Sequence, residues 1–267
     1  MREMSLTEIK NVQLDILKKL HTFCEENNLQ YSVAYGTAIG AIRHKGFIPW
    51  DDDIDVMMPR KDYELLIKTF NAKQADESKY KLTVWKNEPS YELFIARIER
   101  TDTIFSNIDY PIGVNIDIFP IDNLANSRKK AYKIFNFYRI IAKLAPICRR
   151  TTVLNCKRLH GKQLIIRFIL SIITRLFPRD FFFKLCEKKI TKGPSKKFVS
   201  AIFNTTENVI FEQDWFDKFI EVPFEDTTAK IIEKYDEYLK VIFGDYMTLP
   251  PKEDRVGHYR KTKGFWK

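Results

Sequence analysis

The stretch IPWDDDIDVMMPR, residues 48–60, carries four aspartates within five positions, in a chain whose formal net charge is +10. Successive side chains of a strand point to opposite faces, so Asp53 and Asp55 share one face, and Asp51 joins them nearer the preceding loop. Asp52 points the other way and has a supporting role. Adjacent carboxylates resist burial unless a cation lies between them. The stretch predicts a site for Mg²⁺, or Mn²⁺ in its place, because such hard cations prefer oxygen ligands.

The alternative for such an acidic run is a solvated loop, or an edge strand protected by its charges. The apolar residues that follow, Ile54 and Val56 among them, instead predict a buried strand. A further carboxylate, Asp117, lies in the alternating run IGVNIDIF at 112–119, which predicts a second strand. Together these features favour the metal site.

A glycine–threonine pair precedes the acidic run. Gly36 and Thr37 follow a short predicted strand over 31–35 and stand where a helix begins. Glycine lets the backbone approach a phosphate at a helix N-terminus, where free N–H groups favour anions, and threonine adds a hydroxyl donor. Alone, the pair would indicate only a turn and a helix cap. Its place before the acidic run favours phosphate binding.

Basic and aromatic side chains lie between this pair and the acids. Arg43, His44 and Lys45 form a cationic loop, for which we expect contacts to phosphate, with a solvated loop as the alternative. Trp50 adjoins the acids and offers an aromatic face to a trimethylammonium group, an attraction worth up to about 2 kcal/mol when desolvated. The alternative for Trp50 is a place in the core.

The elements that must hold these residues alternate between helices and strands. With 267 residues, 45% of them hydrophobic, the chain can fill a substantial core. Apolar spacing predicts helices over 6–27 and 61–70. Runs of β-branched and aromatic residues predict further strands over 81–85, 93–100 and 112–119. This order predicts an α/β (α+β) fold, with a mixed-sheet catalytic core over residues 1–126.

The rest of the chain divides by charge. Residues 127–197 are basic and predicted to be mainly helical; up to Lys192 they hold eighteen Lys or Arg and two acids, a net charge of +16. Residues 198–267 return to a mixed pattern, in which we expect a helix over 228–243 ended by Gly244. We expect this last segment to pack back on the core.

The order of these motifs resembles the nucleotidyltransferase superfamily, whose pattern is a Gly-Ser or Gly-Thr turn, an Asp-x-Asp strand and a third carboxylate on a neighbouring strand. The interval from Gly36 to Asp53 is longer than is usual there. It contains a recognisable insertion, because YGTAIGAIRHKGFIPWDDDIDVMMPRKDYE closely resembles the signature of the LicD family of phosphotransferases. VNIDIFPID and YDEYLKVIFGDYMTLPPKEDR resemble later segments of that family, so the likeness covers both ends of the chain.

The resemblance implies a nucleotidyltransferase-like fold. It also implies metal-dependent transfer of phosphocholine, or a related substituted phosphate, from a CDP-activated donor such as CDP-choline to a sugar hydroxyl of a cell-surface glycan. Teichoic acid and lipopolysaccharide are such glycans. Asp53 and Asp55 would be catalytic and bind the metal, Asp117 would complete the metal shell or act as general base, and Asp51 is a further candidate ligand. The donor head group (choline, ethanolamine, glycerol or ribitol) stays open.

Two later residues, Arg255 and His258, fall in a family-like segment with no assigned role.

The basic region contains KQLIIRFILSIITRLF, residues 162–177. Its polar side chains share one helical stripe, formed by Gln163, Arg167, Ser171, Thr174 and Arg175. A wide apolar face edged by arginine suits either a core helix or a helix in a membrane interface. We favour contact with the anionic surface of the membrane. The acceptor would then be a lipid-linked glycan.

The expected location of the protein in the cell follows from signals that its sequence lacks. The N-terminal sequence shows no secretory signal, and no stretch reaches the ~18 apolar residues of a spanning helix. The four cysteines show no CxxC spacing and are expected to be reduced. We therefore expect a cytoplasmic protein, peripheral on the inner face of the cytoplasmic membrane.

Two other functions use the same features. A nucleotidyltransferase that moves NMP from an NTP to a small molecule would need the same carboxylates, and only the donor distinguishes it. A nucleic-acid-binding protein would also be basic with interleaved aromatic residues. Because the basic region is dense in aliphatic residues and shows no familiar nucleic-acid module, we expect no nucleic-acid partner.

Overall fold

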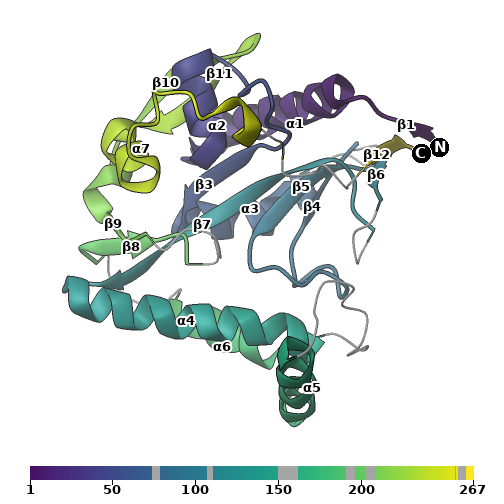
Figure 1. Cartoon of the computed structure of the whole chain (residues 1–267), viewed down its shortest axis with the longest axis vertical. Helices are drawn as coiled ribbons and strands as arrows, with labels where there is room; N and C mark the ends of the chain where they lie inside the picture. Colours follow the sequence, from purple (N-terminus) through teal and green to yellow (C-terminus); the bar gives the residue numbers. More distant parts are fainter. Residues whose placement is uncertain are drawn as a thin grey trace.

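A mixed β-sheet organises the protein, shown in Figure 1 as a computed structural model. The structure describes residues 1–73, 79–106, 111–149, 162–190, 196–202, 209–255, 257 and 263–267. Within them the main sheet has seven strands, in the order β2-β3-β7-β5-β4, with β8 paired to β7 and β9 to β8. The strands are β2 (Ser32–Val33), β3 (Asp55–Pro59), β4 (Tyr80–Thr83), β5 (Ala96–Arg100), β7 (Asn115–Ala125), β8 (Phe198–Ser200) and β9 (Phe211–Glu212). Only the pairing of β3 with β7 is parallel among these described strands.

The first helix, α1 (Leu6–Glu26), begins at a capping box. The Ser5 hydroxyl accepts a hydrogen bond from the Glu8 N–H, and the Glu8 carboxylate accepts one from the Ser5 N–H. Its apolar side is buried against the sheet, where Ile16 and Leu20 are fully enclosed. The other helices of this part are α2 (Tyr35–Ile39), which continues as a π-helix over Gly40–His44, and α3 (Arg60–Lys73).

A second, small sheet joins the two ends of the chain. It has the order β1-β12-β6 in the described residues, from Arg2–Glu3, Gly264–Trp266 and Thr103–Phe105. Figure 1 accordingly shows the N- and C-termini side by side.

One predicted helix is wrong in its first half. Residues 227–232 form a strand, β11 (Thr227–Ile232), which pairs with β10 (Phe219–Phe224), and only α7 (Tyr235–Phe243) is helical. The two-residue connection after β10 closes a hairpin, and Ala229 and Ile231 are then buried on one side of β11. This cross-strand burial outweighs a helical spacing that the sequence also satisfies.

The basic region forms a helical unit around a core of its own. It consists of α4 (Arg128–Arg149), α5 (Lys162–Thr174) and α6 (Phe181–Ile190). Phe135 of α4 and Phe183 of α6 are fully buried in this second apolar cluster, together with Phe198 of β8. Helices, mixed sheet and hairpin together confirm the predicted α/β (α+β) class. Two short 3₁₀ helices, Gln213–Phe216 and Lys252–Asp254, complete the described elements.

Candidate active site

The acidic run meets β7 at one end of the main sheet. Because β3 and β7 are parallel and in register, Asp55, the first residue of β3, lies opposite Asp117. The loop before β3 brings ligand oxygens of Asp51, Asp52 and Asp53 to within 4.8 Å of one another. Asp51 and Asp52 are buried, whereas the other carboxylates are partly exposed. The structure therefore gathers every predicted carboxylate, and it adds Asp52, which the sequence placed on the opposite face.

Burial and the neighbouring negative charges act together on Asp55. Burial, followed by the charges of Asp53, Asp117 and Asp51, raises its pKa well above the usual range of an aspartate, and the guanidinium of Arg97 opposes the shift. A cluster of carboxylates that offers oxygen donors alone suits a hard divalent cation. The donor set therefore fits Mg²⁺ or Mn²⁺.

Arg97 is a site residue that the sequence analysis did not identify. It lies on β5, opposite Asp117 in the antiparallel pairing with β7. Its Nε and Nη2 donate to the two carboxylate oxygens of Asp117, at 2.5 and 3.0 Å. The Arg97 side chain is 10% exposed. A charged residue inside an apolar strand needs a partner, which was the available signal, but the sequence does not show which residue lies opposite.

The predicted phosphate turn has a visible structural role. A Cβ atom on Gly36 would lie 2.7 Å from Asp51 Oδ2, so the glycine makes room for that carboxylate. The Asp55 N–H donates to Thr37 Oγ1 at 2.9 Å, which anchors the start of β3. Both residues thus position the acidic run, and their contact with phosphate stays a prediction.

The cationic loop turns toward the C-terminal segment. Arg43 Nη1 donates to the Tyr246 carbonyl at 2.5 Å, and its Nε donates to His44 Nε2 at 3.0 Å. Burial, with a smaller contribution from Arg255, lowers the pKa of Arg43. Lys45 adopts a left-handed conformation, with φ of 59°, at the end of the π-helix. None of these contacts reaches the carboxylates.

The ring of Trp50 makes a cation–π contact with an arginine of the same chain. The guanidinium carbon of Arg255 lies 5.3 Å from the centroid of the Trp50 ring. His44 meets the same ring edge-on, with centroids 6.4 Å apart. One face predicted for choline is therefore occupied by Arg255. His258 lies outside the described residues.

Helix α1 and the C-terminal segment hold the acidic loop in place. Gln13 Nε2 donates to the carbonyls of Asp52 and Asn115, which ties the loop to β7. Lys10 Nζ donates to the carbonyls of the preceding residues 48 and 49, at 3.2 and 3.0 Å. A Cβ atom on Gly257 would lie 2.5 Å from Asp52 Oδ2, so that backbone packs directly on the loop. These long-range contacts were not predictable from local sequence.

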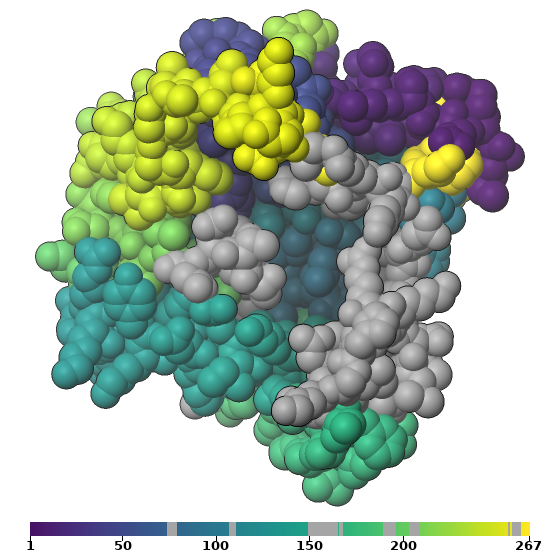
Figure 2. Space-filling view, in the orientation of Figure 1, coloured from purple at the N-terminus to yellow at the C-terminus, as the bar shows by residue number. Residues whose placement is uncertain are grey.

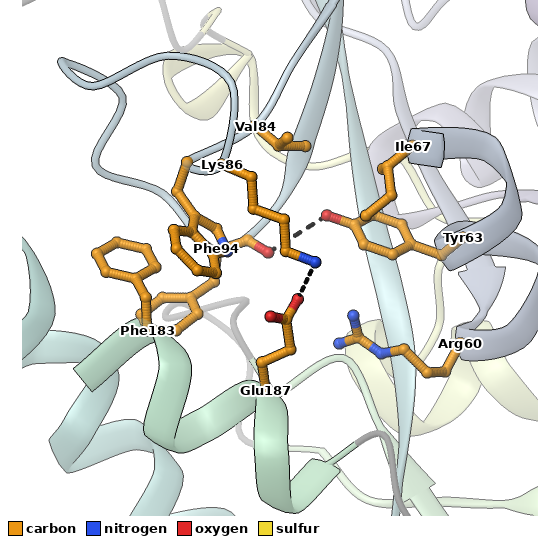
Figure 3. Close-up of a pocket in the computed structure, with 9 residues that line it drawn as sticks. Arg60, Tyr63, Ile67, Val84, Lys86, Phe94, Phe183 and Glu187 are labelled. Atoms are coloured by element: carbon orange, nitrogen blue, oxygen red, sulfur yellow. Dashed lines mark hydrogen bonds and ion pairs between the residues drawn. The ribbon is translucent and has the colours of Figure 1, made fainter. Parts of the chain in front are cut away.

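A pocket away from the acidic run lies where helix α6 packs against the main sheet and α3 (Figure 3). It is lined by Arg60, Tyr63, Ile67, Val84, Trp85, Lys86, Phe94, Phe183 and Glu187. Lys86 forms an ion pair with Glu187 of α6, and Arg60 binds both carboxylate oxygens of Asp122, at 2.6 and 2.8 Å. Its charges are thus paired within the protein. We place the candidate active site at the acidic run instead.

Comparison with known proteins agrees with this choice. Residues 28–140 match the family model described as LicD/FKTN/FKRP, nucleotidyltransferase domain, a span that contains the whole acidic run and Asp117. The match defines the class as a nucleotidyltransferase-type domain. Over 276 aligned positions, covering 97% of each chain, the protein is 30% identical to the lipopolysaccharide cholinephosphotransferase LicD of Haemophilus influenzae. The chain belongs to the LicD family.

Two further relatives match parts of the chain. An uncharacterized protein of Rickettsia typhi is 27% identical over 157 residues, covering 51% of this chain and 50% of its own. One of Rickettsia prowazekii is 29% identical over 98 residues, covering 35% of this chain and 36% of its own.

Proposed function

We propose that this protein is a metal-dependent phosphotransferase that moves phosphocholine from CDP-choline to a sugar hydroxyl of a cell-surface glycan. One observation carries the proposal: the similarity to a lipopolysaccharide cholinephosphotransferase extends over 97% of the chain. The span that matches the family model, residues 28–140, contains the carboxylates that β3 and β7 bring together. Phosphoryl transfer needs positioning and charge stabilisation more than covalent help from the protein, which suits this group of acids.

Asp53 and Asp55, with Asp51, would hold the cation, Mg²⁺ or Mn²⁺. When bound, it would neutralise charge on the donor pyrophosphate and on the CMP leaving group. Gly36 and Thr37 maintain the positions of Asp51 and Asp55 through the close approach and the hydrogen bond described above.

Asp117 would complete the same group of ligands, with Arg97 as its positioning residue. The two hydrogen bonds from Arg97 fix both carboxylate oxygens of Asp117 in the plane of the guanidinium. Each oxygen retains a second lone pair, so this ion pair still permits Asp117 to face a cation. Coordination of a cation through these lone pairs is the role that we propose for Asp117, and proton transfer is the alternative.

The remaining candidate is transfer of NMP from an NTP, which the family description "nucleotidyltransferase domain" favours. Calorimetric titration of CDP-choline, CDP-ribitol and CTP, each with and without Mg²⁺, separates the two. We expect Mg²⁺-dependent binding with preference for CDP-choline. Preference for CTP, followed by labelling of an acceptor with CMP, would replace our proposal by nucleotidyl transfer, and preference for CDP-ribitol would change the donor.

We also propose that the acceptor is a lipid-linked glycan, and that the protein works as a peripheral protein on the cytoplasmic face of the membrane. The net charge of +16 between Ser127 and Lys192 supports attraction to anionic lipid.

A further inference from the structure

Helix α5 is inverted in polarity relative to a helix on the surface of a water-soluble protein. Its polar residues Ser171 and Thr174 are buried, at 5% and 1% exposure. Its large apolar residues face outward, between 47% and 61% exposed; they are Ile165, Phe168, Ile169, Ile172 and Ile173. An amphipathic helix that packs against a core from water does the reverse. The outer face of α5 therefore suits an apolar medium.

Contacts on the inner face hold this orientation. The Ser171 hydroxyl donates to the Phe168 carbonyl at 2.7 Å, and the Thr174 hydroxyl donates to the Ser171 carbonyl at 3.2 Å. The Thr174 carbonyl accepts a hydrogen bond from Cys148 of α4, with an Sγ–O distance of 3.3 Å. The buried hydroxyls are thus satisfied within α5, and α4 fixes its C-terminal end.

The apolar surface continues beyond the end of α5. Leu176 is 83% exposed, and Phe177, 38% exposed, stacks on Phe181 with ring centroids 4.8 Å apart. Figure 1 shows α5 at an end of α4, away from α1 and α2, and in Figure 2 it forms the lower end of the molecule, coloured green. Large apolar side chains that gather on an exposed surface mark an interaction site.

The surrounding charge indicates which partner. Arg175 and Arg179 are exposed beside Leu176 and Phe177, within a region of net charge +16. An anionic membrane surface attracts such cations, whereas a second copy of the chain would bring a second positive surface against the first. Charge complementarity therefore favours anionic lipid over self-association.

We propose that α5, with Leu176 and Phe177, docks the protein on an anionic bilayer by inserting its outward apolar face into the interface. No helix in the described part of the chain is long and apolar enough to cross a membrane. In this proposal the helix lies in the plane of the surface, with Arg175 and Arg179 at the level of the phosphates.

Resting on the proposed function, docking through α5 also limits how the acceptor can reach the carboxylates. Strand β7 carries Asp117 near its start and leads into α4 after Ala125. At ~3.3 Å per residue, the strand alone separates the carboxylates from the helical unit by roughly 25 Å. A lipid-linked acceptor would therefore have to reach the site as an extended glycan, with its lipid held near α5.

Sedimentation with vesicles tests the docking surface. The full chain is mixed with vesicles of phosphatidylcholine alone or with phosphatidylglycerol, and the double variant I169S/I172S is compared with V241S, which changes a residue of α7 that is 51% exposed. We expect the wild type to bind phosphatidylglycerol vesicles and V241S to bind like wild type. The affinity of the double variant for these vesicles should be lower by a factor of roughly ten or more. Circular dichroism and Tm establish that each variant is folded.

Unchanged vesicle binding by I169S/I172S would overturn the proposal. So would a change from dimer to monomer in light scattering without a change in vesicle binding, since α5 would then be a protein interface. Calorimetry with CDP-choline keeps the two proposals apart. Vesicle binding without CDP-choline binding would leave the docking intact and remove the function, whereas CDP-choline binding without vesicle binding would do the opposite.

Discussion

Asp55 lies where three other carboxylates act on it at once. Asp53 and Asp51 approach from the loop and Asp117 from the neighbouring strand, and Arg97 supplies the opposing positive charge. Carboxylates held this close repel one another, and a bound cation would offset that repulsion. The proposed cation site and an electrostatic cost to the metal-free fold would therefore have the same origin.

Substitution of Asp55 separates these two effects. D55N should lower kcat/KM for transfer about 100-fold or more, because a ligand of the proposed cation is lost. The metal-free variant should melt at a higher temperature than the metal-free wild type, because one of the repelling charges is removed. Enzyme assays and calorimetric melting check the two results. D217N, at an exposed position, should change neither. Wild-type turnover by D55N would remove Asp55 from the site.

Arg97 provides a second prediction, about positioning. Lysine keeps the charge but cannot form the two parallel hydrogen bonds to Asp117, so R97K should weaken Mg²⁺ binding about 10- to 100-fold, as measured by calorimetry. R100K is the matched control, because Arg100 is an 11% exposed arginine of the same strand that pairs with Asp15 and Asp102. Equal Mg²⁺ affinity in both variants would show that Arg97 has no role at the site.

Local sequence pointed to the acidic run and the glycine–threonine pair because those residues are close together along the chain, and to Asp117 because it lies in an alternating run typical of a strand. Arg97, Gln13 and Lys10 act through contacts that depend on strand pairing and on the packing of α1, so no local pattern shows them. Trp50 shows a different limit, since its aromatic character was evident but its partner Arg255, about 200 positions away, was not.

At the scale of elements, periodicity and capping located most helices and strands. The capping box of α1 consists of residues that are adjacent in the sequence, Ser5-Leu6-Thr7-Glu8, and needs no tertiary contact to form. The error at 228–234 arose because the segment has apolar residues at helical spacing and is also half of a hairpin. Pairing with β10, a tertiary effect, decided between the two.

The capping box predicts a dependence on pH. Hydrogen bonds from Arg2 and then Ser5 lower the pKa of Glu8 from 4.5 to about 2. Since the folded pKa is lower than the unfolded one, the ionised Glu8 stabilises the fold above pH 4.5, and this stabilisation is lost as the pH falls toward 2. In urea melts, E8Q should therefore be less stable than wild type at pH 7, with the difference closing at pH 2. E26Q, which changes an exposed glutamate at the other end of α1, is the matched control.

The whole molecule combines two apolar cores with different tasks. The first, around the main sheet, includes Ile54 and Val56, which flank the carboxylates, and the second holds the helices of the basic region. Composition indicated a change of character near residue 127. For α5 it left open a core helix or a helix in a membrane interface, because helical periodicity defines two faces without saying which one is buried. The basic surroundings favoured the interface.

The two cores meet at the pocket of Figure 3, which allows a test of their independence. Phe183 is fully buried there and stacks on Phe94, with ring centroids 4.2 Å apart. F183A should cost about 3–5 kcal/mol of unfolding free energy and loosen the helical unit from the sheet. F137A, on α4 at 45% exposure, should cost far less. Because the carboxylates belong to the first core, F183A should still bind CDP-choline in calorimetry but sediment poorly with phosphatidylglycerol vesicles. Loss of nucleotide binding in folded F183A would mean that the two cores act as one unit.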